Sequence, residues 1–400
     1  MHTVQRVGAS DVIITPSPVA MVWNEPGRPH EAIAAPGVRL SLGEALVEVE
    51  LATICGLDVQ TVRGDRPAPS PLVLGHEQVG RVVAVGDGAL SVDAQPVELG
   101  QRVVWSTTVG CGDCDRCLRG LPQACVAVGR YGHERVHRGW ELSGGFATHV
   151  QLRNGTAIVH VPEHVPSRVL APAACATASA VAALDAASAR LDLARALVLV
   201  TGAGLTGLTV AAMAIEAGAE VIVSEPEAAR REFARRVGAV AVDPGARAAS
   251  PERLDATLAA FAQRGHPEVL VAIDASGAAS GIRAAVDSVG DGGVAVLVGR
   301  VPVGSEVCLD AESLARRLVT ISAVRDSTGE QLRRAVAFLE RSWRPSTSSG
   351  NGSGAGSPTG MSFDEFVGAT YPLAAVDDAL AEAATGAHVR VGIAPGRRPV

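Results

Sequence analysis

A series of short apolar runs in the middle of the chain most constrains what it can fold into. From about Leu191 onward, the runs ALVLVTG, EVIVSEP, VLVAIDASG and VAVLVGR are separated by alanine-rich segments of helical length. Strands that are buried on both faces of a parallel sheet have this texture, because helical crossovers cover both faces of such a sheet. We therefore expect a doubly wound α/β domain over residues 178–323.

A glycine motif follows the first of these runs. The stretch LVLVTGAGLTGL places Gly202, Gly204 and Gly207 as G-x-G-x-x-G directly after a strand and at the start of a helix. In a dinucleotide-binding turn the first glycine permits the turn, the second lets the backbone approach a pyrophosphate, and the third lets helix and strand close. The alternative is a nucleotide-free α/β domain in which the glycines only tighten turns.

An acidic residue after the next strand favours the dinucleotide interpretation. Glu225 ends the run EVIVSE, where a carboxylate can accept hydrogen bonds from the adenosine ribose hydroxyls. Such a carboxylate repels a 2′-phosphate, so the sequence favours NAD over NADP. Arg230 and Arg231 follow closely and could reverse that preference.

The first 170 residues have a different texture, which predicts a mostly β domain. The stretch EALVEVELATICG alternates apolar and polar positions, VVAVG and RVVWS add β-branched runs, and glycines and prolines lie between them. We expect residues 1–20 to be a loosely ordered extension and 21–177 to form a barrel or sandwich. Residues 344–360, which are rich in Ser and Gly, read as a flexible insertion within a segment 324–400 that returns to the first domain.

Four of the seven cysteines lie within fifteen residues. Their spacing is C-x2-C-x2-C-x7-C, which suits a closed tetrahedral zinc site in a lobe over about residues 105–130. A ferredoxin-type run has a shorter last spacing and a following proline, and four unligated thiols would make no packing sense. The predicted structural zinc ligands are Cys111, Cys114, Cys117 and Cys125.

Charge and apolar patterning exclude other classes of partner. The formal net charge is −7 and no long basic run occurs, so nucleic acid is not an expected partner. No uncharged apolar stretch long enough to span a bilayer is present, and no signal peptide is evident at the N-terminus, so we expect a cytoplasmic protein that does not bind membranes. In a reducing compartment clustered thiols are metal ligands more often than disulfides.

Three further residues are candidates for a second metal site. Cys55 and His76 each end a β-like run, and Cys175 lies at the junction of the two predicted domains. Two cysteines and a histidine, with a fourth position left for water or substrate, form one of the known catalytic zinc shells. Each signal alone is weak, since a lone cysteine is usually a small core hydrophobe. We expect Cys308 to be such a small core residue.

Together these motifs resemble a family. The G-H-E at residues 75–77, the C-G-x-D that begins at Cys55, the four-cysteine lobe and the later glycine motif are similar to those of the zinc-containing medium-chain alcohol and polyol dehydrogenases. The resemblance runs from about residue 20 to the end, apart from the insertion. It implies a GroES-like β-barrel catalytic domain, split around a Rossmann nucleotide domain, in a homodimer or homotetramer.

The resemblance also implies roles for individual residues. Cys55, His76 and Cys175 would hold a catalytic zinc, so that each chain would carry two zinc ions. Asp58 would orient the histidine, and Glu77 would be the acid beside the metal. The implied reaction is hydride transfer between a nicotinamide and an alcohol carbon, with zinc as Lewis acid.

The sequence departs from the family at the proton relay. Many members carry a hydroxyl residue and a histidine where this chain has Leu57 and Gln60, so the alcohol proton needs another route. Within the family, the motifs look most like phosphonate-catabolism-associated alcohol dehydrogenases and cyclitol dehydrogenases, which handle small polar substrates. Arg63, Arg66 and His133 could hold an anionic group of such a substrate, or could simply be solvated. A biosynthetic ketone reductase, or a non-catalytic zinc- and nucleotide-binding protein, remain alternatives.

Overall fold

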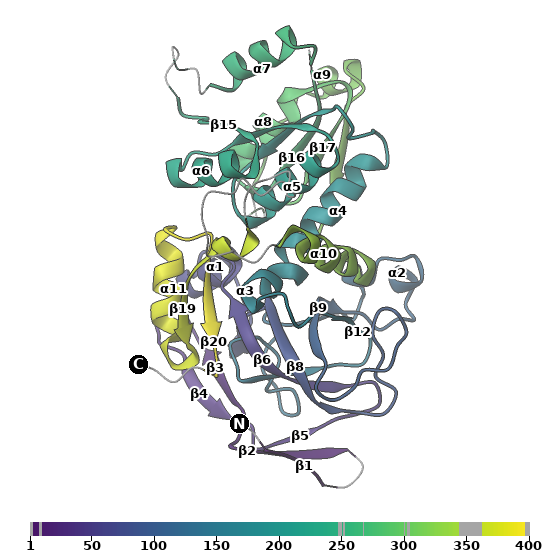
Figure 1. The fold of residues 1–400 in the computed structure, drawn as a ribbon, viewed down its shortest axis with the longest axis vertical. Helices are drawn as coiled ribbons and strands as arrows, with labels where there is room; N and C mark the ends of the chain where they lie inside the picture. The colour runs from purple at the N-terminus through teal and green to yellow at the C-terminus, as the bar shows by residue number, and fades with distance from the viewer. Residues whose placement is uncertain are drawn as a thin grey trace. The chain divides into compact units, whose positions relative to one another are not determined.

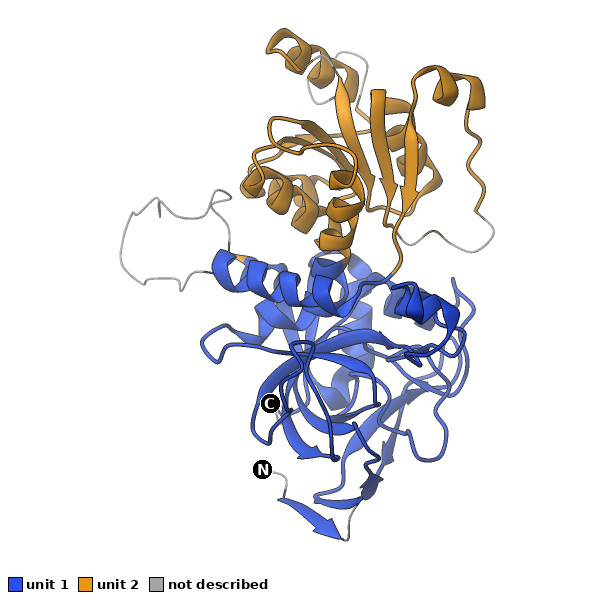
Figure 2. Ribbon diagram, turned by 90° about the vertical axis from the view of Figure 1, so that its right-hand side faces the viewer, with its two compact units in different colours: residues 1–178, 326–343, 363–400 blue, residues 179–325, 344–362 orange. Residues whose placement is uncertain are grey.

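The protein is described here by a computed structural model, which describes residues 3–7, 10–246, 250, 253–266, 268–299, 301, 305–343 and 362–396. The chain divides into two compact units (Figure 2). Unit 1 comprises Met1–Ala178, Asp326–Trp343 and Phe363–Val400, and unit 2 comprises Ser179–Arg325 and Arg344–Ser362. The predicted insertion 344–360 lies outside the described residues.

Unit 1 is built around an eight-stranded, mostly antiparallel sheet with the order β10-β9-β8-β6-β20-β19, in which β11 also pairs with β6 and β12 with β9 (Figure 1). The long strand β6 lies at its centre because it pairs antiparallel with β8, β11 and β20. These strands are β6 Ala45–Thr53, β8 Gln78–Val85, β9 Arg102–Val109, β10 Gly129–Arg130, β11 His149–Leu152, β12 Thr156–His160, β19 Val367–Pro372 and β20 Arg390–Ala394.

The N-terminal segment is ordered where it is described, so the expectation of a loosely ordered extension over residues 1–20 is wrong there. Strands β1 (Thr3–Val7) and β2 (Asp11–Thr15) pair antiparallel, and β5 (Gly37–Arg39) completes their sheet. The physical reason is the alternation in DVIIT, which buries Val12 and Ile14 to 1% exposure each. A further sheet joins β3 Val19–Trp23, β4 Glu31–Ala34 and β7 Leu72–Val73.

Short helices complete unit 1. The core of its main sheet includes the buried aromatic side chains of Trp105, Tyr131 and Phe146. The helices are α1 Gly56–Arg63, α2 Asp115–Leu118, α3 Ser167–Leu170, α10 Gly329–Ser342 and α11 Val376–Thr385, with 3-10 turns at Pro122–Ala124, Ala171–Ala174, Phe363–Phe366 and Leu373–Ala375. Helix α4 (Ala176–Ser188) begins in unit 1 and continues into unit 2.

Unit 2 confirms the doubly wound domain. Its six strands are all parallel in the order β15-β14-β13-β16-β17-β18, and every residue of β13 (Leu197–Thr201) is buried. The other strands are β14 Glu220–Ser224, β15 Val240–Val242, β16 Val269–Asp274, β17 Val289–Leu297 and β18 Thr320–Ala323. Helices α5 Leu205–Glu216, α6 Ala228–Val237, α7 Leu254–Gln263, α8 Ala279–Ser288 and α9 Ala311–Arg316 connect them.

The apolar helices were compared with the length that a bilayer requires. Among the described residues no single helix has the length and apolar character needed to cross a bilayer, although the bent pair Ser167–Ala174 and Ala176–Ser188 passes that test by length and composition.

Cys308 is exposed, which contradicts its expected core position. It lies in an irregular segment before α9, where no strand or helix buries it.

Candidate metal centres and nucleotide site

Cys55 is fixed by the start of helix α1. It follows the end of β6 and caps α1, and its backbone N–H donates to Asp58 Oδ2 at 2.8 Å. The aspartate thereby ties the cysteine to the first turn of the helix. Leu57, in the same turn, is 5% exposed and has no hydroxyl that could pass on a proton.

His76 precedes β8 and is fully buried. Its Nδ1 lies 3.5 Å from Asp58 Oδ1, and the same oxygen is 3.4 Å from the backbone nitrogen of Gly75. Neither ring nitrogen of His76 makes a hydrogen bond of normal geometry within the described residues. A buried imidazole nitrogen without such a bond is expected where an ion is to be bound.

Cys175 follows the buried 3-10 turn Ala171–Ala174. A guanidinium fixes the segment that leads to it: Arg102 donates to the carbonyl oxygens of Pro162 and Val165 at 2.9 and 2.6 Å and to Glu50 Oε2 at 2.8 Å. Because the Arg102 side chain is only 5% exposed, these charge-assisted bonds fix the segment between β12 and Cys175 against strand β9, which carries Arg102.

The three predicted ligands converge, and Glu77 joins them. Ligand atoms of Cys55, His76, Glu77 and Cys175 all lie within 4.8 Å of one another. Two thiols and an imidazole are donors that zinc accepts readily. The donor set and the imidazole nitrogens without hydrogen bonds therefore fit a zinc ion.

Glu77 is also held by a buried cation. Its carboxylate accepts from Arg390 Nε at 2.8 Å and Nη2 at 3.0 Å, and from Thr53 Oγ1 at 2.7 Å. The Arg390 side chain is 9% exposed and that of Glu77 is fully buried. Sequence reasoning missed Arg390 and Thr53, since an arginine at the start of the run VRVGI carries no sign of its partner 313 residues away.

The pKa values of the Cys55 thiol and the His76 imidazole are shifted in opposite directions, and only the thiol shift favours metal binding. The contact with Cys175 lowers the pKa of Cys55 well below its usual value, against the opposing effect of burial, and His76 and Arg390 add to the decrease. Burial disfavours the His76 cation, yet Asp58 and Cys55 raise its pKa to about 10. A thiolate favours metal binding because a metal must displace fewer protons from it.

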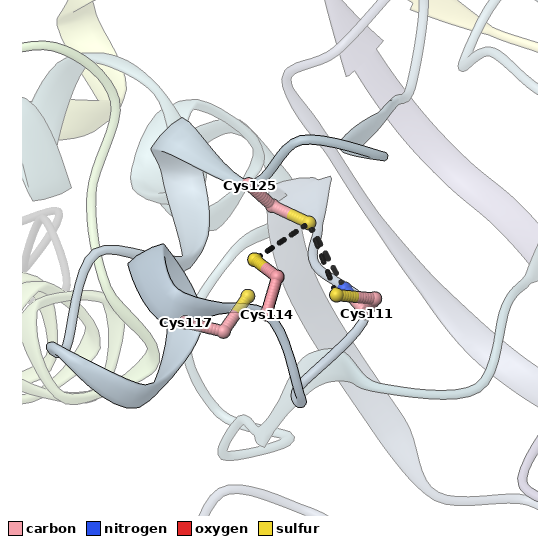
Figure 3. Close-up of side chains that lie close together, drawn as sticks. All are labelled: Cys111, Cys114, Cys117 and Cys125. Carbon is pink, nitrogen blue, oxygen red and sulfur yellow. Dashed lines mark hydrogen bonds between the residues drawn. The ribbon is translucent and has the colours of Figure 1, made fainter.

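The four-cysteine lobe forms a second cluster, with all ligand atoms again within 4.8 Å (Figure 3). The Sγ of Cys125 lies 3.4 Å from that of Cys111 and 3.9 Å from that of Cys114. Backbone N–H groups of Val126 and Cys117 lower the pKa of Cys114 to about 6. No disulfide joins the seven cysteines, all of which the structure describes.

The residues proposed to hold a substrate anion lie in different places. The His133 ring packs against the His76 ring in a tilted arrangement, with centroids 4.6 Å apart and planes at 38°. Arg63 is exposed and donates to the carbonyl oxygen of Ala384 in α11 at 3.2 Å. Arg66 and Gln60 are partly buried.

The glycine motif in unit 2 has the geometry of a nucleotide turn. Gly202 has φ +96°, and a Cβ at Gly207 would lie 1.9 Å from the Gly202 carbonyl oxygen. Gly204 is the N-cap residue of α5 and so offers no side chain to the helix start. A Cβ placed at Gly204 would have no other atom within 4 Å, so the space there is open. Unpaired N–H groups at a helix start beside open space fit a pyrophosphate.

Glu225 lies beside this turn and is 5% exposed. Its carboxylate accepts from the backbone nitrogens of Ala203 at 2.7 Å and Glu227 at 2.9 Å. Arg231 is engaged within the protein, since it donates to the carbonyl oxygen of Glu225 at 2.9 Å. Arg230 is partly buried, and its Nε makes no hydrogen bond within the described residues.

Comparisons with known proteins agree with both halves of this description. The alcohol dehydrogenase GroES-like domain matches residues 41–163, and the zinc-binding dehydrogenase domain matches residues 206–341. The chain is 32% identical over 292 residues to L-galactonate-5-dehydrogenase of Escherichia coli, covering 72% of this chain and 76% of that protein. It is 31% identical over 261 residues to 5-exo-hydroxycamphor dehydrogenase of Pseudomonas putida, covering 64% of this chain and 70% of that protein.

Solved structures share the fold. An alcohol dehydrogenase from Thermotoga maritima superposes with a TM-score of 0.81 at 24% identity, covering 94% of this chain and 99% of that one. The matched domains and the curated relatives together show that the chain belongs to the zinc-containing medium-chain alcohol and polyol dehydrogenase family.

Proposed function

We propose that the protein is a zinc-dependent oxidoreductase that transfers hydride between a nicotinamide cofactor and a secondary alcohol or ketone of a small polar substrate. The convergence of Cys55, His76 and Cys175 carries the proposal. The four cysteines of the lobe offer enough thiols to complete a tetrahedral zinc shell. A second set that offers three soft or borderline donors leaves a coordination position for substrate.

The surrounding residues orient the three ligands. The Asp58 carboxylate accepts a hydrogen bond from the Cys55 backbone N–H and lies 3.5 Å from His76 Nδ1, so it contacts two of the three ligand residues. Zinc bound there supplies a Lewis acid that stabilises negative charge on a substrate oxygen. Arg390 neutralises Glu77, so that this carboxylate adds no uncompensated charge beside the site.

For the cofactor we propose NAD in preference to NADP. The turn at Gly202–Gly207 suits the pyrophosphate, and the Glu225 carboxylate suits ribose hydroxyls and disfavours a 2′-phosphate. Arg230 is the nearby cation that could attract that phosphate. Solved structures of this fold include an NADP complex at 22% identity and an NADH complex at 23% identity, so the fold accommodates either cofactor.

For the substrate we propose a polyol, a cyclitol or a phosphorylated or phosphonate alcohol. Leu57 and Gln60 remove the usual relay, so a hydroxyl neighbouring the reacting carbon is a suitable carrier for the proton. Among the curated relatives, several are dehydrogenases of L-galactonate or L-threonine. These names favour hydroxylated acids as the first compounds to test.

Metal analysis and a substrate screen test the proposal together. We expect two zinc ions per chain in the purified protein and one in Cys175→Ser, with nicotinamide absorbance changing on addition of a suitable alcohol. One ion in the wild-type protein, located in the lobe, would refute the catalytic centre and favour a non-catalytic zinc- and nucleotide-binding protein. Assays with both alcohols and ketones separate an oxidative role from a biosynthetic reductase.

We further propose a cytoplasmic homodimer or homotetramer. The clustered reduced thiols favour that compartment. Cell fractionation and sedimentation equilibrium test the two statements separately.

A further inference from the structure

The contact between Asp58 and His76 is too long to fix the imidazole plane alone. The 3.5 Å separation of Nδ1 and Oδ1 exceeds the length of a normal N–H···O bond. A metal-binding imidazole nevertheless needs a defined ring plane, because its lone pair lies in that plane. Another contact must therefore contribute to the orientation of this ring.

The ring of His133 supplies such a contact. It lies against the ring of His76 with a centroid separation of 4.6 Å and an interplanar angle of 38°. At this separation the two tilted rings are in contact, and rotation of His76 about its Cβ–Cγ bond would disrupt the contact. The packed His133 side chain therefore restricts the direction of the metal-binding nitrogen.

The backbone around His133 is packed directly on the backbone of the metal-binding motif. Gly132 has φ +73°, and a Cβ there would lie 2.4 Å from the carbonyl oxygen of Gly75. Its N–H donates to the carbonyl oxygen of Ser143 at 2.9 Å, and the N–H of His133 donates to that of Arg130 at 3.2 Å. Only glycine permits this approach, so the turn brings His133 to His76 without an intervening side chain.

Arg130 anchors the turn at its start. Its Nη1 lies 2.7 Å from Asp326 Oδ2, and the Asp326 side chain is 2% exposed. Its Nη2 donates to the carbonyl oxygen of Gln123 at 3.3 Å. Gln123 lies two residues before Cys125, so one guanidinium joins the four-cysteine lobe, the returning segment at 326 and the turn that carries His133.

We propose that His133 is a positioning residue for the metal ligand His76, and that Arg130 holds His133 in place by linking its turn to the four-cysteine lobe. The inference rests on the proposed function, because it assumes an ion at Cys55, His76 and Cys175. It gives the lobe a role toward the second metal centre as well as toward local stability. It also assigns His133 to ring packing rather than to binding a substrate anion.

Cobalt substitution tests this assignment without turnover. Dialysis of the holoprotein against Co²⁺ should exchange the open site while the closed four-thiolate lobe retains zinc. Metal analysis then counts each ion, the visible d–d bands report ligand geometry, and competition with a chelator gives the affinity. The variants are His133→Leu, His133→Phe and Arg130→Met, with the exposed Arg138→Met as the matched control.

We expect His133→Leu to shift the d–d bands and to weaken Co²⁺ binding by about tenfold, the lower end for removal of a group that orients a ligand. His133→Phe should restore both, Arg130→Met should show the same shift with a smaller loss, and Arg138→Met should match the wild type. Wild-type bands and affinity in His133→Leu would overturn the inference, as would failure of His133→Phe to restore them. A wild-type chain without a second ion would overturn the proposed function, and the inference with it.

Discussion

Removing Arg390 should strongly destabilise unit 1. The change Arg390→Met deletes both charge-assisted bonds to Glu77 and leaves that carboxylate with the Thr53 hydroxyl as a neutral donor. The Glu77 side chain is fully buried, so water cannot replace the lost bonds. Burial of an uncompensated charge is the costly case for an ion pair.

The magnitude follows from this geometry. Both guanidinium contacts are 3.0 Å or shorter, and the two side chains are 9% and 0% exposed. Breaking such a buried pair from one side costs about 3–5 kcal/mol, which is roughly a hundredfold to several thousandfold in the unfolding equilibrium. A double change that also replaces Glu77 by Gln should recover most of the loss, because it removes the buried charge as well.

Tryptophan fluorescence during urea unfolding is the suitable assay. The four tryptophans all belong to unit 1, so the signal reports that unit and not the nucleotide-binding unit. They are Trp23, Trp105, Trp140 and Trp343. Measurements on chelator-treated protein keep metal binding out of the free energy of unfolding.

An exposed ion pair provides the control. Arg333 and Glu330 lie 2.7 Å apart in α10 with side chains 45% and 58% exposed, and Arg333→Met should leave the urea midpoint almost unchanged. If Arg390→Met shifts the midpoint no more than Arg333→Met does, the argument from burial is wrong.

Four further changes test the site and the fold. Cys175→Ser should lose one zinc ion and all turnover while far-ultraviolet circular dichroism stays unchanged; retained activity would remove Cys175 from the centre. Cys114→Ser should release the lobe zinc and lower Tm before kcat changes in the surviving holoprotein, as paired metal and thermal measurements would show. Burial raises the pKa of Tyr131 from 10 to about 12. Its contribution to the free energy of unfolding should therefore be fully present below pH 10 and fall by about 2–3 kcal/mol as the pH rises to 12, because the tyrosine ionises first in the unfolded chain. Tyr131→Phe should flatten this part of the pH profile. Glu225→Gln keeps an acceptor for the Ala203 N–H but loses the charge, so fluorescence titration should show NADP binding improved relative to NAD, and an unchanged ratio would misplace the ribose contact.

The predictable parts of the molecule were those whose partners are near in sequence. Cys111 to Cys125 form a local cluster, so their spacing alone indicated a metal site. The apolar runs that become the parallel strands and the turn that begins at Gly202 are also local patterns. Cys55, His76 and Cys175 have ordinary neighbours in the chain, so each signal was weak by itself, and the family resemblance strengthened the prediction that they meet.

The parts that sequence reasoning missed depend on long-range pairing. Arg390 meets Glu77 because β20 is inserted beside β6, and Arg102 reaches the linker before Cys175 because β9 begins opposite it. His133 was considered for an anion, whereas its ring packs on His76. No local pattern distinguishes such arginines and histidines from solvated ones.

The division of unit 1 into separated segments sets an order of assembly during translation. The main stretch of unit 2, residues 179–325, is synthesised before β20 (Arg390–Ala394), so β6 lacks its β20 neighbour until residues 390–394 have been made. Until then the end of β6 at Ala52–Thr53 lacks the strand that it pairs with there. Unit 1 is thus completed only after residues 179–325 have been made, and a nascent chain stalled before residue 390 would lack the Arg390 guanidinium that pairs with the buried Glu77 carboxylate.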